Sequence, residues 1–152
     1  TVIAVDNQQS NYKQSPGGEE EGLNIHRVPT VIVYKNGQEV NRLVESPQAS
    51  IEADLAKISS TNAYTPKYES VRLVHEALMS QGLEKFEKNH ATLIPKLKPI
   101  TSNMYELNTY ANVLYFSGRQ DAAIAVAKLN LLLFPSEVNA QKSLARKIEQ
   151  FE

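Results

Sequence analysis

The sequence predicts an α+β fold that is built from two consecutive parts. In the first part, a β-branched run at Thr30–Lys35 is followed by Asn36 and Gly37, a pair that favours a two-residue hairpin turn. Beyond Lys67, apolar residues recur at helical spacing and strand signals are no longer found. We therefore expect a small mixed domain over residues 1–60, a linker over 61–67 and an all-α domain over 68–152.

The composition limits the functions that the chain can perform. It has 152 residues, a formal net charge of −1 and no cysteine. Without cysteine, the chain itself provides no disulfide, thiolate metal site or cysteine nucleophile. The near-neutral charge argues against a nucleic-acid partner, because phosphate backbones are bound by a basic excess. No apolar run approaches the roughly 18 residues that a membrane-spanning helix needs, so no membrane span is expected.

Before the hairpin, the sequence predicts a strand, a loop and a turn. Residues 2–6 (Val-Ile-Ala-Val-Asp) are apolar and indicate a buried strand. The stretch 7–22 is polar and rich in Gly, Gln and Glu, which is typical of a surface loop. Residues 23–25 predict a short turn or helix.

The hairpin should be followed by a helix. Its strands are expected at 30–35 and 38–45, and Ser46 with Pro47 favours the start of a helix. The apolar residues of that helix, at spacings of four and three, would share one face: Ile51, Leu55 and Ile58.

The order of these features resembles the C-terminal half of the thioredoxin family. The resemblance covers about residues 1–60, and its most specific part is Val28-Pro29-Thr30 followed by the hairpin turn. It implies a cis Val28–Pro29 bond and a partial thioredoxin-like sheet of strand, cis-proline, hairpin and closing helix. In that family, the backbone just before this proline pairs with an extended substrate peptide, which is β-strand addition. Val28, Pro29 and Thr30 are therefore the candidate peptide-binding residues.

One departure from the family affects how its function carries over. The family's first strand, central strand and helix with the C-x-x-C motif all precede the strand that residues 2–6 would match. We expect this chain to be a fragment of a thioredoxin-family thiol–disulfide oxidoreductase, with no catalytic residue of its own. The alternative is a redox-inactive scaffold that binds a protein or peptide. The rival explanation to a fragment is that a partner chain, or a second copy in a homo-oligomer, fills the place of the missing strand.

Two further points stay open at this stage. A small α+β protein unrelated to that family would have a trans bond at Pro29 or lack the hairpin; there, Pro29 would merely end a turn before an edge strand. A periplasmic or secreted location would suit an oxidoreductase parent, and the residues leave a cytoplasmic location open.

Five helices are expected in the second part, at 69–80, 83–94, 103–117, 121–134 and 136–148. Pro95 and Pro99 should stop the second of them. The third and fourth resemble one tetratricopeptide repeat, which implies a structural or partner-binding module. The residues that carry this resemblance are large, small or turn-forming: Leu107, Tyr110, Ala111, Leu114, Gly118, Ala123 and Pro135. Ala127 and Asn130 depart from the repeat pattern.

Other candidate sites are weak. His26, His75 and His90 have no second histidine or carboxylate at a ligand-pair spacing, so neither a metal nor a cofactor is expected. The acidic run at 19–21 is more typical of a solvated loop than of a contact patch. In the third helix, Tyr115 and Phe116 could belong to the core or to an interface.

Overall fold

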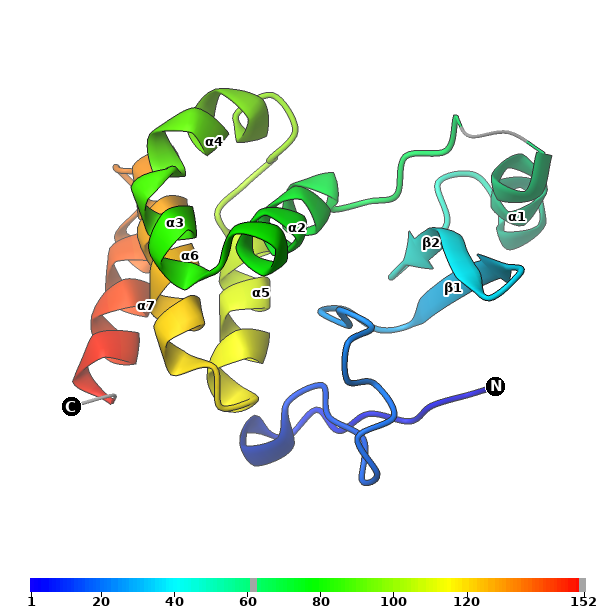
Figure 1. The fold of residues 1–152 in the computed structure, drawn as a ribbon, viewed down its shortest axis with the longest axis horizontal. Helices are drawn as coiled ribbons and strands as arrows, with labels where there is room; N and C mark the ends of the chain where they lie inside the picture. The colour runs from blue at the N-terminus through cyan, green and yellow to red at the C-terminus, as the bar shows by residue number, and fades with distance from the viewer. Residues whose placement is uncertain (61–62, 151–152) are drawn as a thin grey trace. The chain divides into compact units, whose positions relative to one another are not determined.

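The computed structural model describes residues 1–60 and 63–150. Within them the fold is α+β, with a two-stranded antiparallel sheet and seven α-helices. The chain forms two compact units (Figure 1): the sheet unit, Arg27–Glu69, and the helical unit, which joins Thr1–His26 to the residues from Ser70 onward. In this division the first 26 residues group with the helices.

The hairpin of the sheet unit has the expected form. β1 (Thr30–Lys35) pairs with β2 (Gln38–Val44), and Lys35 lies opposite Gln38. Asn36 and Gly37 have φ angles of 53° and 77°, as a two-residue turn between twisted strands requires. The register shifts between Val33 and Tyr34, which leaves one extra residue in β2 as a bulge.

The helix after the hairpin, α1 (Ile51–Ser60), begins later than the predicted start at Ser46 and Pro47. The Asp54 carboxylate accepts hydrogen bonds from the backbone N–H groups of Gln48 (2.6 Å) and Ala49 (3.3 Å), which holds these residues outside the helix. The Ser50 hydroxyl accepts a bond from the Ala53 N–H at 3.1 Å and caps the first turn. Of the three apolar residues predicted to share one face, Ile58 is buried and Ile51 is 53% exposed.

The predicted strand at residues 2–6 was also wrong. This segment has no strand partner among the described residues, and Val2 is 97% exposed. Asp6 instead forms two backbone hydrogen bonds with the turn that follows it. Its N–H donates to the Gln14 carbonyl, and its carbonyl accepts from the Lys13 N–H, both at 2.8 Å. An apolar, β-branched segment does not form a strand without a neighbour that completes its hydrogen bonds.

The stretch that follows is a loop, as predicted, with one 3₁₀ turn, η1 (Gln9–Asn11). It is tied to the helical unit, because the Gln14 side-chain amide donates to the Phe116 carbonyl at 2.8 Å. The Tyr12 and Phe116 rings also meet edge to face, with centroids 6.0 Å apart. Leu23 lies in a bend, and residues 23–25 form no helix. Residues 61 and 62 of the expected linker lie outside the described residues, and residues 63–67 form no helix or strand.

The helical unit contains six helices within the described residues: α2 (Glu69–Gln81), α3 (Leu83–Lys88), α4 (His90–Leu97), α5 (Tyr105–Phe116), α6 (Gln120–Leu133) and α7 (Val138–Glu149). The single helix expected at 83–94 is therefore two helices that divide at Asn89. Pro95 lies inside α4 and does not stop it. Pro95 and Ala91 are both exposed, so the backbone bond that proline removes is lost where water can replace it.

The core of the helical unit is built around α6. This helix packs against α3, α4, α5 and α7. Its buried alanines allow close approach of these neighbours: Ala122, Ala123, Ala125 and Ala127. Asn130 is also buried, and its side-chain amide donates to the Met104 carbonyl at 2.9 Å. The two positions that departed from the repeat pattern are thus core positions.

The hairpin turn should depend on the backbone conformation of Gly37. A Cβ atom there would meet no atom within 4 Å, so a substitution acts through φ alone. We expect Gly37→Val to destabilise the sheet unit by about 1–2 kcal/mol, since a β-branched residue resists positive φ. Gly37→Asn is the matched control and should cost less, because Asn tolerates this region. Urea unfolding followed by NMR signals of β1 would measure both, and equal losses would contradict the explanation.

Candidate peptide-binding edge

The three candidate binding residues lie together where the chain enters β1. The Val28–Pro29 peptide bond is cis, which is the isomer that the resemblance implies. Val28 is 42% exposed, Pro29 is exposed and Thr30 is partly buried. The segment is therefore accessible from solvent.

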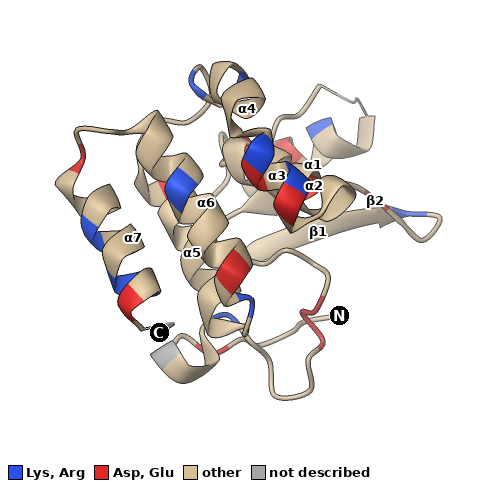
Figure 2. Ribbon diagram, turned by 60° about the vertical axis from the view of Figure 1, so that its left-hand side comes forward, with Lys and Arg blue, Asp and Glu red and all other residues tan. Residues whose placement is uncertain are grey.

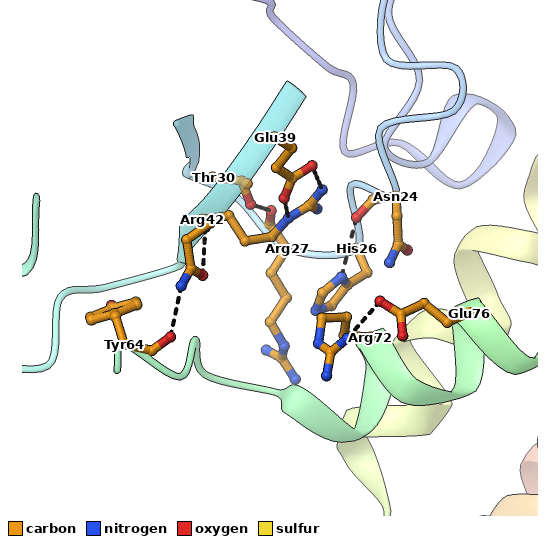
Figure 3. Close-up of polar contacts among 10 residues, drawn as sticks. Asn24, His26, Arg27, Thr30, Glu39, Arg42, Tyr64, Arg72 and Glu76 are labelled. Atoms are coloured by element: carbon orange, nitrogen blue, oxygen red, sulfur yellow. Dashed lines mark hydrogen bonds and ion pairs between the residues drawn. The ribbon is translucent and has the colours of Figure 1, made fainter. Parts of the chain in front are cut away.

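The backbone carbonyls on either side of Val28 are already used within the sheet unit. The Thr30 hydroxyl donates to the Arg27 carbonyl at 2.8 Å (Figure 3), and the Glu45 N–H donates to the Pro29 carbonyl at 2.7 Å. Within the described residues, the backbone N–H and C=O of Val28 itself have no hydrogen-bond partner. Val28 thus offers one donor and one acceptor at an exposed position.

The free edge of β1 continues from this point. Because Pro29 bonds to Glu45, alternation along an antiparallel pair directs the backbone groups of Val31 and Val33 toward β2. The backbone groups of Thr30, Ile32 and Tyr34 then point to the opposite side, where no strand pairs among the described residues. An unpaired edge of this kind can receive another strand.

A cluster of Arg27, Glu45 and Tyr68 fixes the start of this edge. The Arg27 guanidinium lies 3.2 Å from the Glu45 carboxylate and 4.2 Å from the centre of the Tyr68 ring. The Tyr68 hydroxyl donates to the same carboxylate. This hydrogen bond, aided by the Arg27 charge, lowers the pKa of Glu45 despite partial burial.

The backbone at this cluster is unusual. Glu45 and Tyr68 have φ angles of 68° and 62°, a region that L-residues other than Asn and Asp rarely adopt. The contacts among the three side chains hold these conformations in place. No sequence pattern predicts the cluster, because its members are separated by about twenty residues and form no motif. On β2, Arg42 and Glu39 form a further ion pair at 2.6 Å (Figure 3).

A second network attaches the segment after α1 to the sheet. The Asn41 side-chain amide donates to the Tyr64 carbonyl at 2.7 Å, and the Tyr64 hydroxyl donates to Asp54 at 3.0 Å. Burial raises the pKa of Tyr64 to about 12. The backbone N–H of Gln48 lowers the pKa of Asp54, so that carboxylate is ionised when it accepts these bonds.

The histidines have structural surroundings. His75 hydrogen-bonds the buried Tyr110 hydroxyl at 2.8 Å, and the His90 ring packs edge to face on Phe86 at 4.9 Å. His26 lies 3.4 Å from the Asn24 carbonyl. Across residues 1–60 and 63–150, no three His, Asp or Glu side chains are grouped in a way that could hold a metal ion.

The acidic run and the aromatic pair of α5 that the sequence analysis named have local contacts. Glu19 and Glu20 bind the Ser15 hydroxyl and so close their own loop. The Phe116 ring contacts Tyr12 of the N-terminal segment and also the ring of its neighbour Tyr115. No helix in the described part of the chain is both long and apolar enough to cross a membrane.

Comparison with known protein families, curated proteins and solved structures found no match to this chain. Its function is therefore inferred from the residues and their geometry alone.

Acidification should weaken the sheet unit through Glu45. The pKa of this carboxylate is lowered in the folded state, so its contribution is present above the ordinary value of 4.5 and is lost as the pH falls through the lowered value. We expect Glu45→Gln to flatten this part of the pH dependence, because the amide does not titrate. Unfolding of the sheet unit, followed by β1 NMR signals between about pH 6 and pH 3, measures the effect.

Glu84→Gln serves as the control, since it removes one negative charge from an exposed ion pair of α3. A Glu45→Gln variant with the wild-type pH profile would show that Glu45 does not carry the effect.

Proposed function

We propose that residues 27–60 belong to the C-terminal half of a thioredoxin-like domain whose parent is a thiol–disulfide oxidoreductase. The order of Val28-Pro29-Thr30, hairpin and closing helix supports this proposal. The observation that carries it is the free edge of β1 beside the exposed backbone of Val28. In the thioredoxin fold the central strand pairs with the strand that β1 matches. An unpaired edge of β1 is therefore expected when another segment supplies that central strand.

In this function, the chain binds and orients the substrate and does not perform the redox step. The N–H and C=O of Val28 would pair with the backbone of an extended peptide, as in β-strand addition. The edge formed by Thr30, Ile32 and Tyr34 would receive the missing strand. The cysteine pair that exchanges disulfides would come from a segment outside this chain.

The second candidate is a redox-inactive binding scaffold. The absence of cysteine from the chain favours it, and the same open edge would bind a partner protein or peptide. In both functions, the α5 and α6 pair is proposed to form one tetratricopeptide-like repeat that acts as a structural or partner-binding module. The two candidates differ in whether the protein that contains this chain has a C-x-x-C pair.

Peptide binding can be tested on the chain itself. The probe is reduced and alkylated insulin B chain, an extended polypeptide without free thiols. We expect it to shift the amide NMR signals of Val28, Thr30 and Ile32. Val28→Pro removes a donor that makes no internal hydrogen bond, so affinity should fall roughly three- to tenfold, the worth of one hydrogen bond.

Val28→Ala is the matched control, because it shortens the side chain and keeps the N–H group. Binding that leaves these three amides unshifted, or that falls equally in both variants, would contradict the assignment of Val28.

The redox candidate is tested on the natural polypeptide as it is made in its source cell. Intact mass and the coding sequence would show whether a C-x-x-C pair belongs to the same protein, and insulin reduction would measure its activity. A polypeptide with no such pair would overturn the oxidoreductase proposal and favour the scaffold.

A further inference from the structure

A row of polar side chains joins α7 to α5, and we call it the polar seam. Its contacts recur every three or four residues on both helices, so they follow one face of each. Asn139 donates to the Tyr105 hydroxyl at 3.0 Å, Ser143 donates to Asn108, and Lys147 donates to Asn112 at 2.7 Å.

Lys147 is the charged member of the polar seam and is buried. Its side chain is 6% exposed, and its ammonium donates to the Asn112 side-chain oxygen at 2.7 Å and to the Ser143 hydroxyl at 2.9 Å. Both acceptors are neutral. A buried ammonium without a carboxylate loses hydration that neutral acceptors replace only in part, so its charged form is disfavoured.

The face that α7 buries has few large apolar side chains, so the charge of Lys147 is a large part of its chemistry. The buried residues of this helix are Ala140, Ser143 and Lys147, which are small or polar. In contrast, α6 buries large aliphatic side chains such as Val126 and Leu129. α7 packs against α6 as well, and the polar seam adds the hydrogen bonds that join it to α5.

Charged groups near the polar seam do not compensate Lys147. On α7 itself, Arg146 adds a second positive charge whose field disfavours the Lys147 ammonium. On α5, the Glu106 carboxylate accepts hydrogen bonds from Ser70 at 2.6 Å and Ser102 at 2.8 Å. On α6, Lys128 pairs with Glu87 of α3 at 3.0 Å.

The remaining ionisable groups of these helices are also engaged elsewhere or exposed. The Tyr110 hydroxyl of α5 meets His75, and that of Tyr105 accepts from Asn139. Asp121 of α6 and Lys142 and Glu149 of α7 are exposed. The helical unit carries acidic and basic residues interspersed along its helices (Figure 2).

We propose that α7 is a pH-dependent latch that docks on α5 more tightly when the Lys147 amine is neutral. Burial lowers the pKa of Lys147 from 10.5 to about 8. Between these two values the undocked helix holds a proton that the docked helix has released, so docking strengthens as the pH rises through this interval. Below it, both forms are charged and docking is at its weakest. Opening of the latch would uncover the α5 face that the polar seam now occupies.

The direct test is the titration of Lys147 in the wild-type chain. NMR of lysine labelled with ¹³C at Cε should give a midpoint for Lys147 near the lowered value of about 8. A Lys147 midpoint near 10.5 would overturn the proposal, whatever happens to any variant.

The latch itself can be followed with a single thiol, since the chain has no other. Ala140 is 2% exposed and lies on the docking face, so a cysteine at Ala140→Cys reacts with a thiol reagent only when α7 opens. Labelling rates are divided by those of an unfolded reference peptide at the same pH. The opening constant should fall by up to about tenfold per pH unit between about pH 8 and pH 10, the limit for one proton.

Adding Lys147→Met should abolish that pH dependence, whereas Lys142→Met should preserve it. Equal pH dependence with and without Lys147 would show that another group governs α7, and the proposal would fail.

Discussion

A β-strand carries backbone hydrogen-bonding groups along two edges, and only one edge of β1 is paired with another strand in the described residues. Much of the sheet unit follows from this constraint. β2 covers the inner edge, a short turn joins the two strands, and the backbone of Thr30, Ile32 and Tyr34 is left on the open side. Two strands and one helix bury little, which is why Val31 and Tyr34 are 40% and 50% exposed. The open edge is thus the feature that any function of this unit must explain.

Side-chain contacts stabilise a unit with so small a core. The Glu45 N–H binds the Pro29 carbonyl, and the Glu45 carboxylate binds Arg27 and Tyr68. The Asp54 carboxylate accepts hydrogen bonds from the backbone N–H of Gln48, before α1, and from the Tyr64 hydroxyl, after it. These polar contacts fix the two ends of the hairpin where a larger domain would use apolar packing. They also leave Val28 as the exposed point between two anchored carbonyls.

Local patterns in the sequence predicted the elements that local physics determines. The hairpin at Asn36 and Gly37 was correct, because turn conformation depends on those two residues. The strand at residues 2–6 was wrong, since a strand needs a partner that its own residues do not specify. The late start of α1 depends on one carboxylate, Asp54, reaching back to Gln48. The prediction that Pro95 stops a helix was wrong, because its exposed position in α4 makes the loss of one backbone hydrogen bond tolerable.

The candidate site could be predicted in part. Val28, Pro29 and Thr30 came from a short motif, and their accessibility agrees with a binding role that stays a proposal. The Arg27, Glu45 and Tyr68 cluster could not be foreseen, because its members meet only after the hairpin forms. The same holds for the polar seam, because the burial of Lys147 against Asn112 depends on how α7 packs on α5.

The most direct test of the open edge is amide hydrogen exchange along β1 in the chain alone. The amides of Val31 and Val33 should be protected by β2, while those of Ile32 and Tyr34 should exchange nearly as fast as in an unfolded peptide. Alternating protection of this kind would establish a strand with one free edge. Equal, strong protection at all four amides would contradict the account, because it would mean that another strand already covers the edge.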